Sequence, residues 1–308
     1  MQVLCLMAPT ASGKTALALE LAARYPVEII SVDSAMVYKH MDIGTAKPSA
    51  NELSAAPHHL IDIIDPAQSY SAGQFCHDAE RLCQQIHGRG KVPLLVGGTC
   101  LYFHLFQQGF DRFIGQDPEI YQQVNAKANV LGWPAMHQLL QLLDPPTAAQ
   151  LHPNDAQRIS RALSVYYASG IPLSQHKSQQ AWSDRRFEWV NIALLPSDRS
   201  QLHARIADRF SAMMQAGFIQ EVRALFERGD LNAALPSMKM VGYRQAWQYL
   251  SGHLSLDAMQ YQAICATRQL AKRQFTWLRK WSRLHAFDPL SSHCQASVYA
   301  LLDQILKV

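Results

Sequence analysis

The 308-residue chain contains no apolar run long enough to cross a bilayer. Its longest runs, such as VLCLM and VPLLV, fall far short of the roughly 20 residues that a transmembrane helix needs. The first residues lead into an apolar segment without the basic stretch and cleavage site of a secretory signal. We therefore expect a cytoplasmic protein without a membrane segment.

Cysteine pairs with metal-binding spacing are also absent. None of the six cysteines forms a Cys-x-x-Cys pair, which argues against a zinc site, and a disulfide framework is not expected in such a long chain without a secretory signal. Ordinary thiols in a reducing cytoplasm are the expected state. The cysteines are Cys5, Cys76, Cys83, Cys100, Cys265 and Cys294.

Acidic residues are missing from 258 to 287, although the net charge of the whole chain is only +4. That segment interleaves basic side chains with Tyr261, Phe275, Trp277 and Trp281. On a helix, positions 268, 272, 279 and 283 would share one face, which suits a phosphate backbone and unstacked bases. A solvated basic helix is the alternative. The basic residues are Arg268, Lys272, Arg273, Arg279, Lys280 and Arg283.

The first hundred residues alternate apolar segments with amphipathic ones. VLCLM, VEIISV and VPLLV read as buried strands, and a helix is expected after the first of them, ending before Pro26. A second helix starts with a capping box from Ser71 to Gln74. Nearly continuous apolar strands between helices predict an α/β fold, with a parallel sheet covered by helices on both faces.

The pattern changes from residue 104 to 187, where glutamine, histidine and proline become frequent and strands vanish. We interpret 104–187 as an all-helical insertion, with 1–103 and 188–308 forming one α/β core. The strand WVNIALL returns to the core pattern. Helices are expected at 118–131, 133–143, 154–169, 198–216, 218–228, 241–250, 255–281 and 292–307, with a short strand at RLHAF.

The stretch APTASGKT, residues 8–15, follows a strand and precedes a helix. Gly13, Lys14 and Thr15 match the phosphate-binding P-loop pattern, whose backbone N–H groups and helix N-terminus attract an anion. Thr15 is a candidate ligand for Mg²⁺. Ala8 stands where the pattern has glycine, and alanine is tolerated there only if its φ stays negative. The loop predicts a polyphosphate or diphosphate ligand.

Acids near this loop are scarce. A P-loop kinase usually has an acid after a later strand, but VPLLV ends in Gly97, Gly98 and Thr99. Asp62 and Asp65 are weak substitutes and suit a solvated loop equally well. Asp33 ends the strand VEIISV, and ligands of parallel sheets bind at such strand ends, so Asp33 should border the same cleft as the loop. Capping of a loop or helix is its alternative role.

Taken together, these segments resemble the bacterial tRNA dimethylallyltransferases, also called tRNA isopentenyltransferases. That resemblance implies transfer of a dimethylallyl group from dimethylallyl diphosphate to the exocyclic N6 amine of the adenosine 3′ of the anticodon in tRNA. Diphosphate would then be a leaving group, and the fold a P-loop NTPase-like core. The resemblance rests on PTASGKT (9–15), SVDSAMVYKHMDIGTAKP (31–48), PLLVGGT (93–99), HPNDAQRISRAL (152–163), GYRQ (242–245) and CATRQLAKRQFTWLR (265–279).

The resemblance also implies roles for individual residues. Asp33 would take a proton from the amine, Thr99 would contact the base or the diphosphate, and Lys14 would stabilise the leaving group. Mg²⁺ would be bound through Thr15. Diphosphate binding would use Arg209 and the loop residues Ala8, Pro9, Thr10, Ala11, Ser12, Gly13, Lys14 and Thr15.

Contacts to the anticodon stem and loop would compensate for flipping the target base out of its stack. Three positions depart from the family: Ala8, where glycine is usual, Lys239, where arginine is usual, and Tyr121, where a basic residue is usual. The implied tRNA-binding residues are Asp33, Ser34, Ala35, Met36, Thr99, Tyr121, Gln157, Arg158, Ile159, Ser160, Arg161, Lys239, Met240, Val241, Gly242, Tyr243, Arg244, Lys272, Arg273, Gln274, Phe275, Thr276, Trp277, Leu278 and Arg279.

Two other functions compete with this one. A small-metabolite kinase with the same core would bind ATP and turn over without RNA. An RNA-binding protein with a degenerate loop and no catalysis is supported only by Ala8. We expect a monomer whose partners are tRNA and dimethylallyl diphosphate, with no membrane partner.

Overall fold

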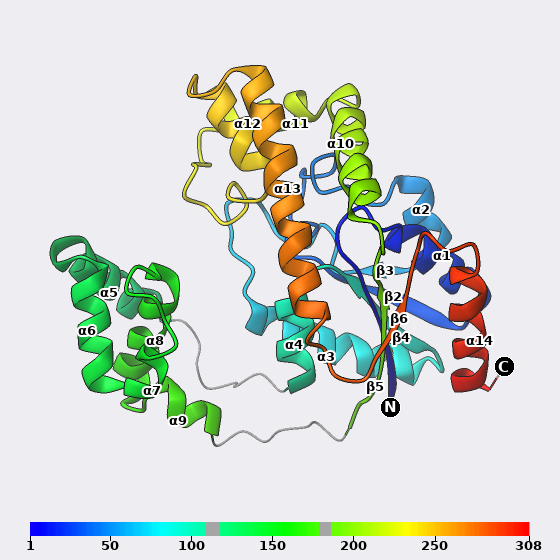
Figure 1. The fold of residues 1–308 in the computed structure, drawn as a ribbon, viewed down its shortest axis with the longest axis horizontal. Coiled ribbons are helices and arrows are strands. Elements are labelled where there is room, and N and C mark those ends of the chain that lie inside the picture. The colour runs from blue at the N-terminus through cyan, green and yellow to red at the C-terminus, as the bar shows by residue number, and fades with distance from the viewer. Residues whose placement is uncertain (109–116, 179–185, 308) are drawn as a thin grey trace. The chain divides into compact units, whose positions relative to one another are not determined.

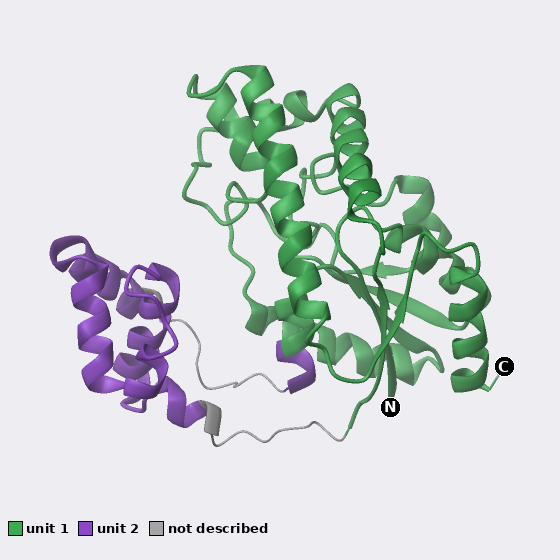
Figure 2. Ribbon diagram, viewed as in Figure 1, with its two compact units in different colours: residues 1–104, 185–308 green, residues 105–184 purple. Residues whose placement is uncertain are grey.

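The structure is a computed structural model that describes residues 1–108, 117–178 and 186–307. The chain divides into two compact units, Met1–His104 with Arg185–Val308, and Leu105–Asp184 (Figure 2). The insertion expected at 104–187 starts one residue before the second unit and ends three residues after it. Its stretches 109–116 and 179–185 lie outside the described residues.

One six-stranded sheet forms the centre of the larger unit (Figure 1). Its order is β3-β2-β4-β1-β5-β6, and every neighbouring pair is parallel, which confirms the predicted fold class. The carboxyl ends of all six strands therefore meet at one edge. The strands are β1 (Gln2–Met7), β2 (Val27–Val32), β3 (His58–His59), β4 (Val92–Gly97), β5 (Glu188–Leu194) and β6 (Leu284–Phe287).

Successive side chains of a strand point to opposite faces of the sheet, and in the buried strands both sets are mainly apolar. Helices therefore cover both faces. Leu4 and Leu6 of β1 pack into one cluster with α1 (Lys14–Arg24) and α14 (Cys294–Leu306). Cys5, between them, belongs to the other face. Burial raises the pKa of the Cys83 thiol on α3 (Ala72–Gly88), and the nearby Cys5 raises it further.

Four helices of the C-terminal half form a second core with the segment after β2. Phe210, Phe218, Tyr243 and Met259 pack there against Tyr38 and its neighbours. These helices continue the larger unit beyond the carboxyl edge of the sheet (Figure 1). They are α10 (Arg199–Gln215), α11 (Phe218–Phe226), α12 (Tyr243–Leu250) and α13 (Leu256–Leu278).

Helix α13 ends earlier than the sequence pattern predicted. The expected range was 255–281, but the helix stops at Leu278, with Arg279 at its C-cap. Arg283 has a left-handed φ of 53° and lies between the helix and β6. The prediction that positions 268, 272, 279 and 283 share one helical face is therefore wrong for Arg283.

Local signals predicted the longer helices well and missed the short elements. The capping box at Ser71 is present, because its hydroxyl accepts from the Gln74 N–H at 3.2 Å and the Gln74 side chain accepts from the Ser71 N–H at 2.7 Å. The capped helix α2 (Ala50–Ala55) and α4 (Cys100–Gln108) were not predicted. Strand β3 is too short to produce a period.

The smaller unit is helical throughout its described part and has its own core. Val124, Met136, Leu140 and Leu163 are fully buried there. The last long helix ends at Gly170, whose φ of 70° provides the left-handed cap expected from the sequence. The helices are α5 (Pro118–Leu131), α6 (Trp133–Leu143), α7 (Pro145–Ala148), α8 (Ala156–Ser169) and α9 (Leu173–Ser178).

Two expectations drawn from absences can be compared with the structure. All six cysteines are free thiols, and four of them are buried. Within 1–108, 117–178 and 186–307, no helix has both the length and the hydrophobicity of a membrane span.

A buried carboxylate holds the amino-terminal part of β2 in an ionic cluster. The side chain of Glu28 is 6% exposed and accepts hydrogen bonds from Arg89 at 2.6 and 3.2 Å. His59 lies 2.9 Å away and Lys91 3.2 Å away. The hydrogen bonds from Arg89 lower the pKa of Glu28 to about 2, from an ordinary value of 4.5, against the opposing effect of burial.

We expect Glu28→Gln to destabilise the protein at neutral pH by about 3 kcal/mol, the free energy of a pKa difference of about 2.5 units. Because the folded-state pKa is depressed, this contribution is present above pH 4.5 and is lost as pH falls from about 4.5 to 2. Urea unfolding of both proteins at several pH values tests this. Glu227→Gln, at an exposed position, is the control. A stability difference that does not change with pH would contradict the assignment.

Candidate active site

A cleft of about 720 Å³ opens at the carboxyl edge of the sheet. Loops that follow β1, β2 and β4 supply one side of it, through residues 8–16, 33–36 and 98–101, and the segment 44–46 adds to this side. Helices α10, α11 and α13 supply the other side together with residues 239–243. All of these residues belong to the larger unit, so the cleft lies entirely within one compact body.

The phosphate loop contains two left-handed residues, Ala11 with a φ of 63° and Gly13. Gly13 adopts a left-handed φ of 79° immediately before α1, where residues with a Cβ are strained. Ala8 is not among the residues with positive φ, which satisfies the condition for alanine at this position. The Ser12 hydroxyl is buried and lines the cleft, and it has no hydrogen-bond partner among the residues that the structure describes. An anion bound in the loop would give this hydroxyl an acceptor.

Asp33 and Thr99 lie together where β2 and β4 end. Asp33 Oδ1 accepts hydrogen bonds from the backbone N–H groups of Ala35 at 2.8 Å and Met36 at 3.4 Å. Thr99 Oγ1 accepts from the Ser34 N–H at 3.1 Å. Both side chains line the cleft, and the turn at Asp33 also matches the alternative capping role considered from the sequence.

Lys14 and Arg209 are two of the five basic side chains that line the cleft with Asp33, together with Arg205, Lys239 and Arg273. Burial lowers the pKa of Lys14, which the nearby Asp33 raises and Arg209 lowers. The pKa of Arg209 is also lowered by burial and raised by Asp33. The three charges therefore influence one another across the cleft. Two partly buried cations beside one carboxylate leave net positive charge, which suits an anionic ligand.

The helical side of the cleft is partly apolar, and its apolar residues were not predicted from the sequence. Phe210, Met213, Phe218 and Leu270 line it. They come from helices far apart in the sequence, so no local motif marks them. Arg205 also lines this side and could have been found from the sequence. It lies four residues before Arg209 on the same helix and therefore on the same face.

Glu221 on α11 binds the backbone of residues 42–44 and so fixes the start of the cleft segment 44–46. Its carboxylate accepts from the N–H groups of Asp42 at 2.8 Å, Ile43 at 2.7 Å and Gly44 at 3.1 Å. It also accepts from the Tyr243 hydroxyl at 2.5 Å. The sequence analysis missed Glu221, because its backbone partners lie about 180 residues away in the chain.

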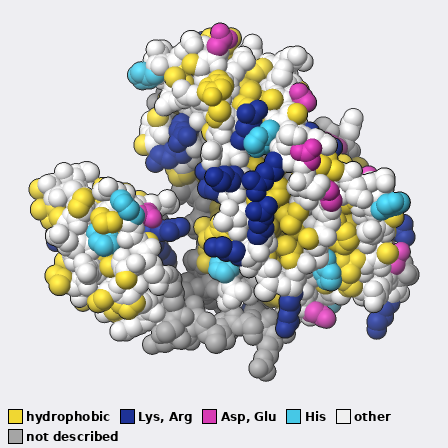
Figure 3. Space-filling model, in the orientation of Figure 1, with side chains coloured by type: hydrophobic (Ala, Val, Ile, Leu, Met, Phe, Trp, Pro, Cys, Tyr) yellow, Lys and Arg dark blue, Asp and Glu magenta, His cyan; other side chains and the backbone are white. Residues whose placement is uncertain are grey.

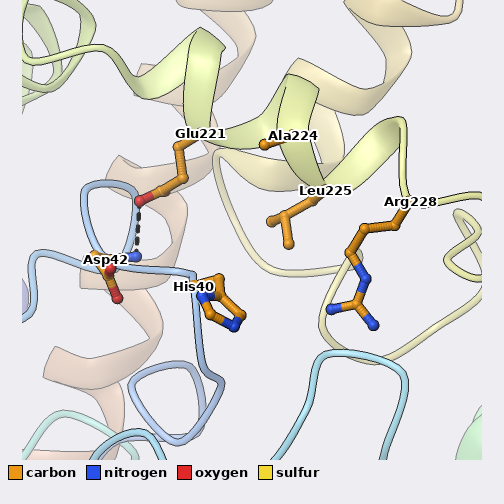
Figure 4. A pocket seen from close by; sticks show the side chains of 6 residues that line it. All are labelled: His40, Asp42, Glu221, Ala224, Leu225 and Arg228. Carbon is orange, nitrogen blue, oxygen red and sulfur yellow. Dashed lines mark hydrogen bonds between the residues drawn. The ribbon is translucent and has the colours of Figure 1, made fainter.

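A second hollow of about 520 Å³ lies beside this contact (Figure 4). Figure 4 shows Glu221 directed to the backbone of Asp42, while Arg228 lies on the far side of Leu225. Arg228 pairs with Asp65 at 2.9 Å and with Asp230 at 2.8 Å. These charged groups already have partners in the fold, so we assign no ligand to this hollow.

Lys and Arg side chains gather on the face of the larger unit that carries α13 (Figure 3). Lys272, Arg273, Thr276 and Trp277 are exposed on this helix, and Arg273 and Trp277 also line the cleft. Lys239, in the loop before α12, and Arg244, in the first turn of α12, are exposed as well. In the smaller unit, Gln157 and Arg158 are exposed, whereas Tyr121 and Arg161 are half-buried.

Several residues within the predicted tRNA-binding ranges are buried instead. Burial leaves almost no side-chain surface for a nucleic acid, so we restrict the tRNA-binding prediction to their exposed neighbours. Their apolar members pack in the cores that hold the helices in place. The buried residues are Ile159, Ser160, Tyr243, Gln274, Phe275 and Leu278.

We expect Ala8→Gly to bind inorganic diphosphate as tightly as the wild type or more tightly. Glycine gives the backbone of the loop more conformational freedom around the anion. The methyl group that the substitution removes packs in the apolar cluster of β1 and α1. Isothermal titration with diphosphate measures the effect. Ala23→Gly, at an exposed position of α1, controls for the general effect of glycine. Weaker binding by Ala8→Gly alone would contradict this account.

Comparison with known proteins identifies similar chains over almost the full length. A family model described as IPP transferase matches residues 36–281, and one described as isopentenyl transferase matches residues 1–66. The chain is 57% identical to a tRNA dimethylallyltransferase of Cupriavidus necator, over 98% of this chain and 95% of the relative. It is 54% identical to that of Ralstonia pickettii, over 94% of this chain and 91% of the relative.

Solved structures agree with these sequence matches. The crystal structure of a tRNA isopentenylpyrophosphate transferase from Bacillus halodurans is 34% identical, with a TM-score of 0.73, over 99% of this chain and 97% of that one. A eukaryotic dimethylallyltransferase, described as acting on tRNA, is 26% identical with a TM-score of 0.86. That match covers 99% of this chain and 80% of the other.

Proposed function

Because the chain belongs to the IPP transferase family, we propose that it transfers a dimethylallyl group from dimethylallyl diphosphate to tRNA. The acceptor is the N6 amine of the adenosine 3′ of the anticodon, and diphosphate is released. One observation carries this proposal. A single cleft combines an anion-binding loop, a carboxylate at a strand end and an exposed basic helix.

The acceptor amine needs a base because its lone pair is delocalised into the adenine ring. As the new C–N bond forms, the amine loses a proton, and the carboxylate of Asp33 is placed to accept it. Oδ1 of Asp33 is held by two backbone N–H groups, which orients the side chain in the cleft. Thr99 lies beside it and is available for a hydrogen bond to the base.

The leaving group needs positive charge at the other end of the cleft. As the allylic C–O bond breaks, negative charge builds on the diphosphate oxygen. Lys14, Arg209 and the N-terminus of α1 stabilise that charge, and desolvation of both cations strengthens their effect. The unpartnered Ser12 hydroxyl adds one further donor.

A magnesium ion fits the same loop. Thr15, which lines the cleft, would supply one hydroxyl ligand, and oxygens of the diphosphate and of water would supply the others. Within the described ranges, no three His, Cys, Asp or Glu side chains gather into a metal site of their own. When bound, Mg²⁺ neutralises charge on the departing diphosphate.

The remaining surfaces fit the two organic substrates. Phe210, Met213 and Leu270 give the cleft an apolar part for a five-carbon group. The exposed basic residues of α13 suit an RNA backbone beside the cleft. Flipping a base into the cleft takes a few kcal/mol, which such contacts offset.

The kinase alternative is not favoured. The solved structures that share this fold at 34% and 26% identity are tRNA-modifying transferases. A kinase would also leave the exposed basic helix without a role.

Transfer of labelled dimethylallyl diphosphate onto unmodified tRNA, with Mg²⁺ and without ATP, tests the proposal directly. We expect label on the RNA and release of one diphosphate for each group transferred. A tRNA with another base at the target position is the control and should stay unlabelled. Absence of transfer, with ATP hydrolysis or phosphorylation of a small molecule instead, would support the kinase.

A further inference from the structure

Gln274 is a buried amide that joins two of the loops of the cleft. Its side chain is 7% exposed and lies on the buried face of α13 with Ala271 and Leu278, while the adjacent Arg273 is exposed. Oε1 accepts a hydrogen bond from the backbone N–H of Thr10 at 2.9 Å. Nε2 donates to the backbone carbonyl of Gly98, also at 2.9 Å. One rigid planar amide thus connects the phosphate loop to the loop after β4.

Each of these two loops carries a different part of the proposed chemistry. Thr10 lies in the loop that would hold the leaving diphosphate, and Gly98 directly precedes Thr99. Thr99 in turn accepts from the Ser34 N–H, next to the proposed base Asp33. The amide of Gln274 therefore spans from the leaving-group side of the cleft to the acceptor side.

The absence of a side chain at residue 98 is part of this arrangement. A Cβ built at Gly98 would lie 2.4 Å from Nε2 of Gln274. That distance is far below van der Waals contact, so the loop after β4 can approach the amide this closely only with glycine at residue 98. This close contact indicates that the loop after β4 restricts the position of the Gln274 side chain, as its own helix does.

We propose that Gln274 is a positioning residue that sets the distance between the diphosphate loop and the acceptor side of the cleft. This deepens the proposed function and rests on it. In-line displacement requires the acceptor nitrogen and the departing oxygen to lie on opposite sides of one carbon. A displacement of about 1 Å between reacting groups lowers a rate by up to about 10²-fold. The neighbours Arg273 and Trp277 line the cleft as well, so α13 places both an RNA-facing surface and this clamp.

The first test compares wild type with Gln274→Leu, which keeps the approximate volume and removes both hydrogen bonds. We expect kcat for prenyl transfer to fall about 10²-fold, with the Kd for tRNA within about threefold of wild type. Gln262→Leu, on the exposed surface of α13, is the matched control and should behave as wild type. An unchanged kcat, or a loss explained fully by weaker tRNA binding, would overturn the proposal.

The second test uses Gln274→Glu and a pH profile. A protonated carboxyl group can accept from Thr10 and donate to Gly98, whereas a carboxylate repels the Gly98 carbonyl. The activity of this variant relative to wild type should therefore rise as pH is lowered from 8 to about 5.5. A ratio that does not change with pH would overturn the clamp, because a general loss of folding predicts no such recovery.

Gly98→Ala provides a third, independent probe. The added methyl should displace the Gln274 amide and reproduce the effect of Gln274→Leu, and the double variant should be no slower than either single one. Independent, additive losses would overturn the clamp. The wild-type transfer assay separates the two proposals. If wild type transfers no prenyl group, the proposed function fails, and the clamp is then judged by inorganic diphosphate binding, which Gln274→Leu should weaken about tenfold.

Discussion

Replacing Asp33 by asparagine should lower kcat for prenyl transfer about 10³-fold, within the range expected for loss of a general base. The amide keeps an oxygen that can accept from the N–H groups of Ala35 and Met36, so the turn after β2 should persist. The substitution removes the ability to take a proton, together with the negative charge that acts on Lys14 and Arg209. Steady-state kinetics with unmodified tRNA and dimethylallyl diphosphate would measure the loss, while filter binding reports the Kd for tRNA.

The Kd for tRNA should stay within about threefold of wild type, because a single neutral substitution leaves the basic surface of α13 intact. Asp257→Asn, in the first turn of α13 and away from the cleft, is the control for loss of one negative charge. Near-normal turnover by Asp33→Asn would remove Asp33 as the base. Thr99 and bound water would then be the remaining candidates for proton transfer.

Gly97→Ala should destabilise the protein by about 3 kcal/mol or more, at the upper end of overpacking effects. A Cβ at residue 97 would lie 2.0 Å from the backbone oxygen of Val32 and 2.5 Å from its carbonyl carbon. Both atoms belong to the backbone of β2, which is paired with β4 in this register. Relief would require the two central strands to separate at the edge that carries Asp33 and Thr99.

Urea unfolding should therefore show a lower midpoint for Gly97→Ala, and residual folded protein should have reduced activity. Gly88→Ala is a matched control, since a Cβ there meets no atom within 4 Å and alanine favours the end of α3. That variant should be as stable as wild type or slightly more stable. Equal stability of both variants would show that the strands adjust to a side chain at residue 97.

The sequence predicted the parts of this fold that depend on neighbouring residues. The largely apolar pattern of 27–32, interrupted by Glu28 and Ser31, marked a buried strand, and the Ser71 capping box marked the first turn of α3. Strand β3 escaped because its two residues contain no period, and its pairing with β2 depends on the tertiary structure. The end of α13 was misjudged because basic side chains continue beyond Leu278, although the helix does not.

The candidate site divides in the same way. Loop 8–15 and Asp33 follow strands directly, so local pattern and the geometry of parallel sheets placed them in one cleft. Glu221 and Gln274 act on backbone groups about 180 and 260 residues distant in the chain. A sequence read residue by residue contains no sign of such pairings. The resemblance to a family placed Gln274 among RNA contacts, whereas the structure buries it against two loops.

The position of β1 in the sheet also affects how the chain folds while it is being synthesised on the ribosome. This first strand lies between β4 and β5, and its pairing with β5 begins at Glu188. At a synthesis rate of about 5–20 residues per second, β5 emerges roughly 10–40 s after β1. Throughout that interval the edge of β1 that pairs with β5 has no partner, while β4 and then the insertion, which has its own core, are synthesised. We expect nascent chains to need protection of this edge by a chaperone until β5 has been synthesised.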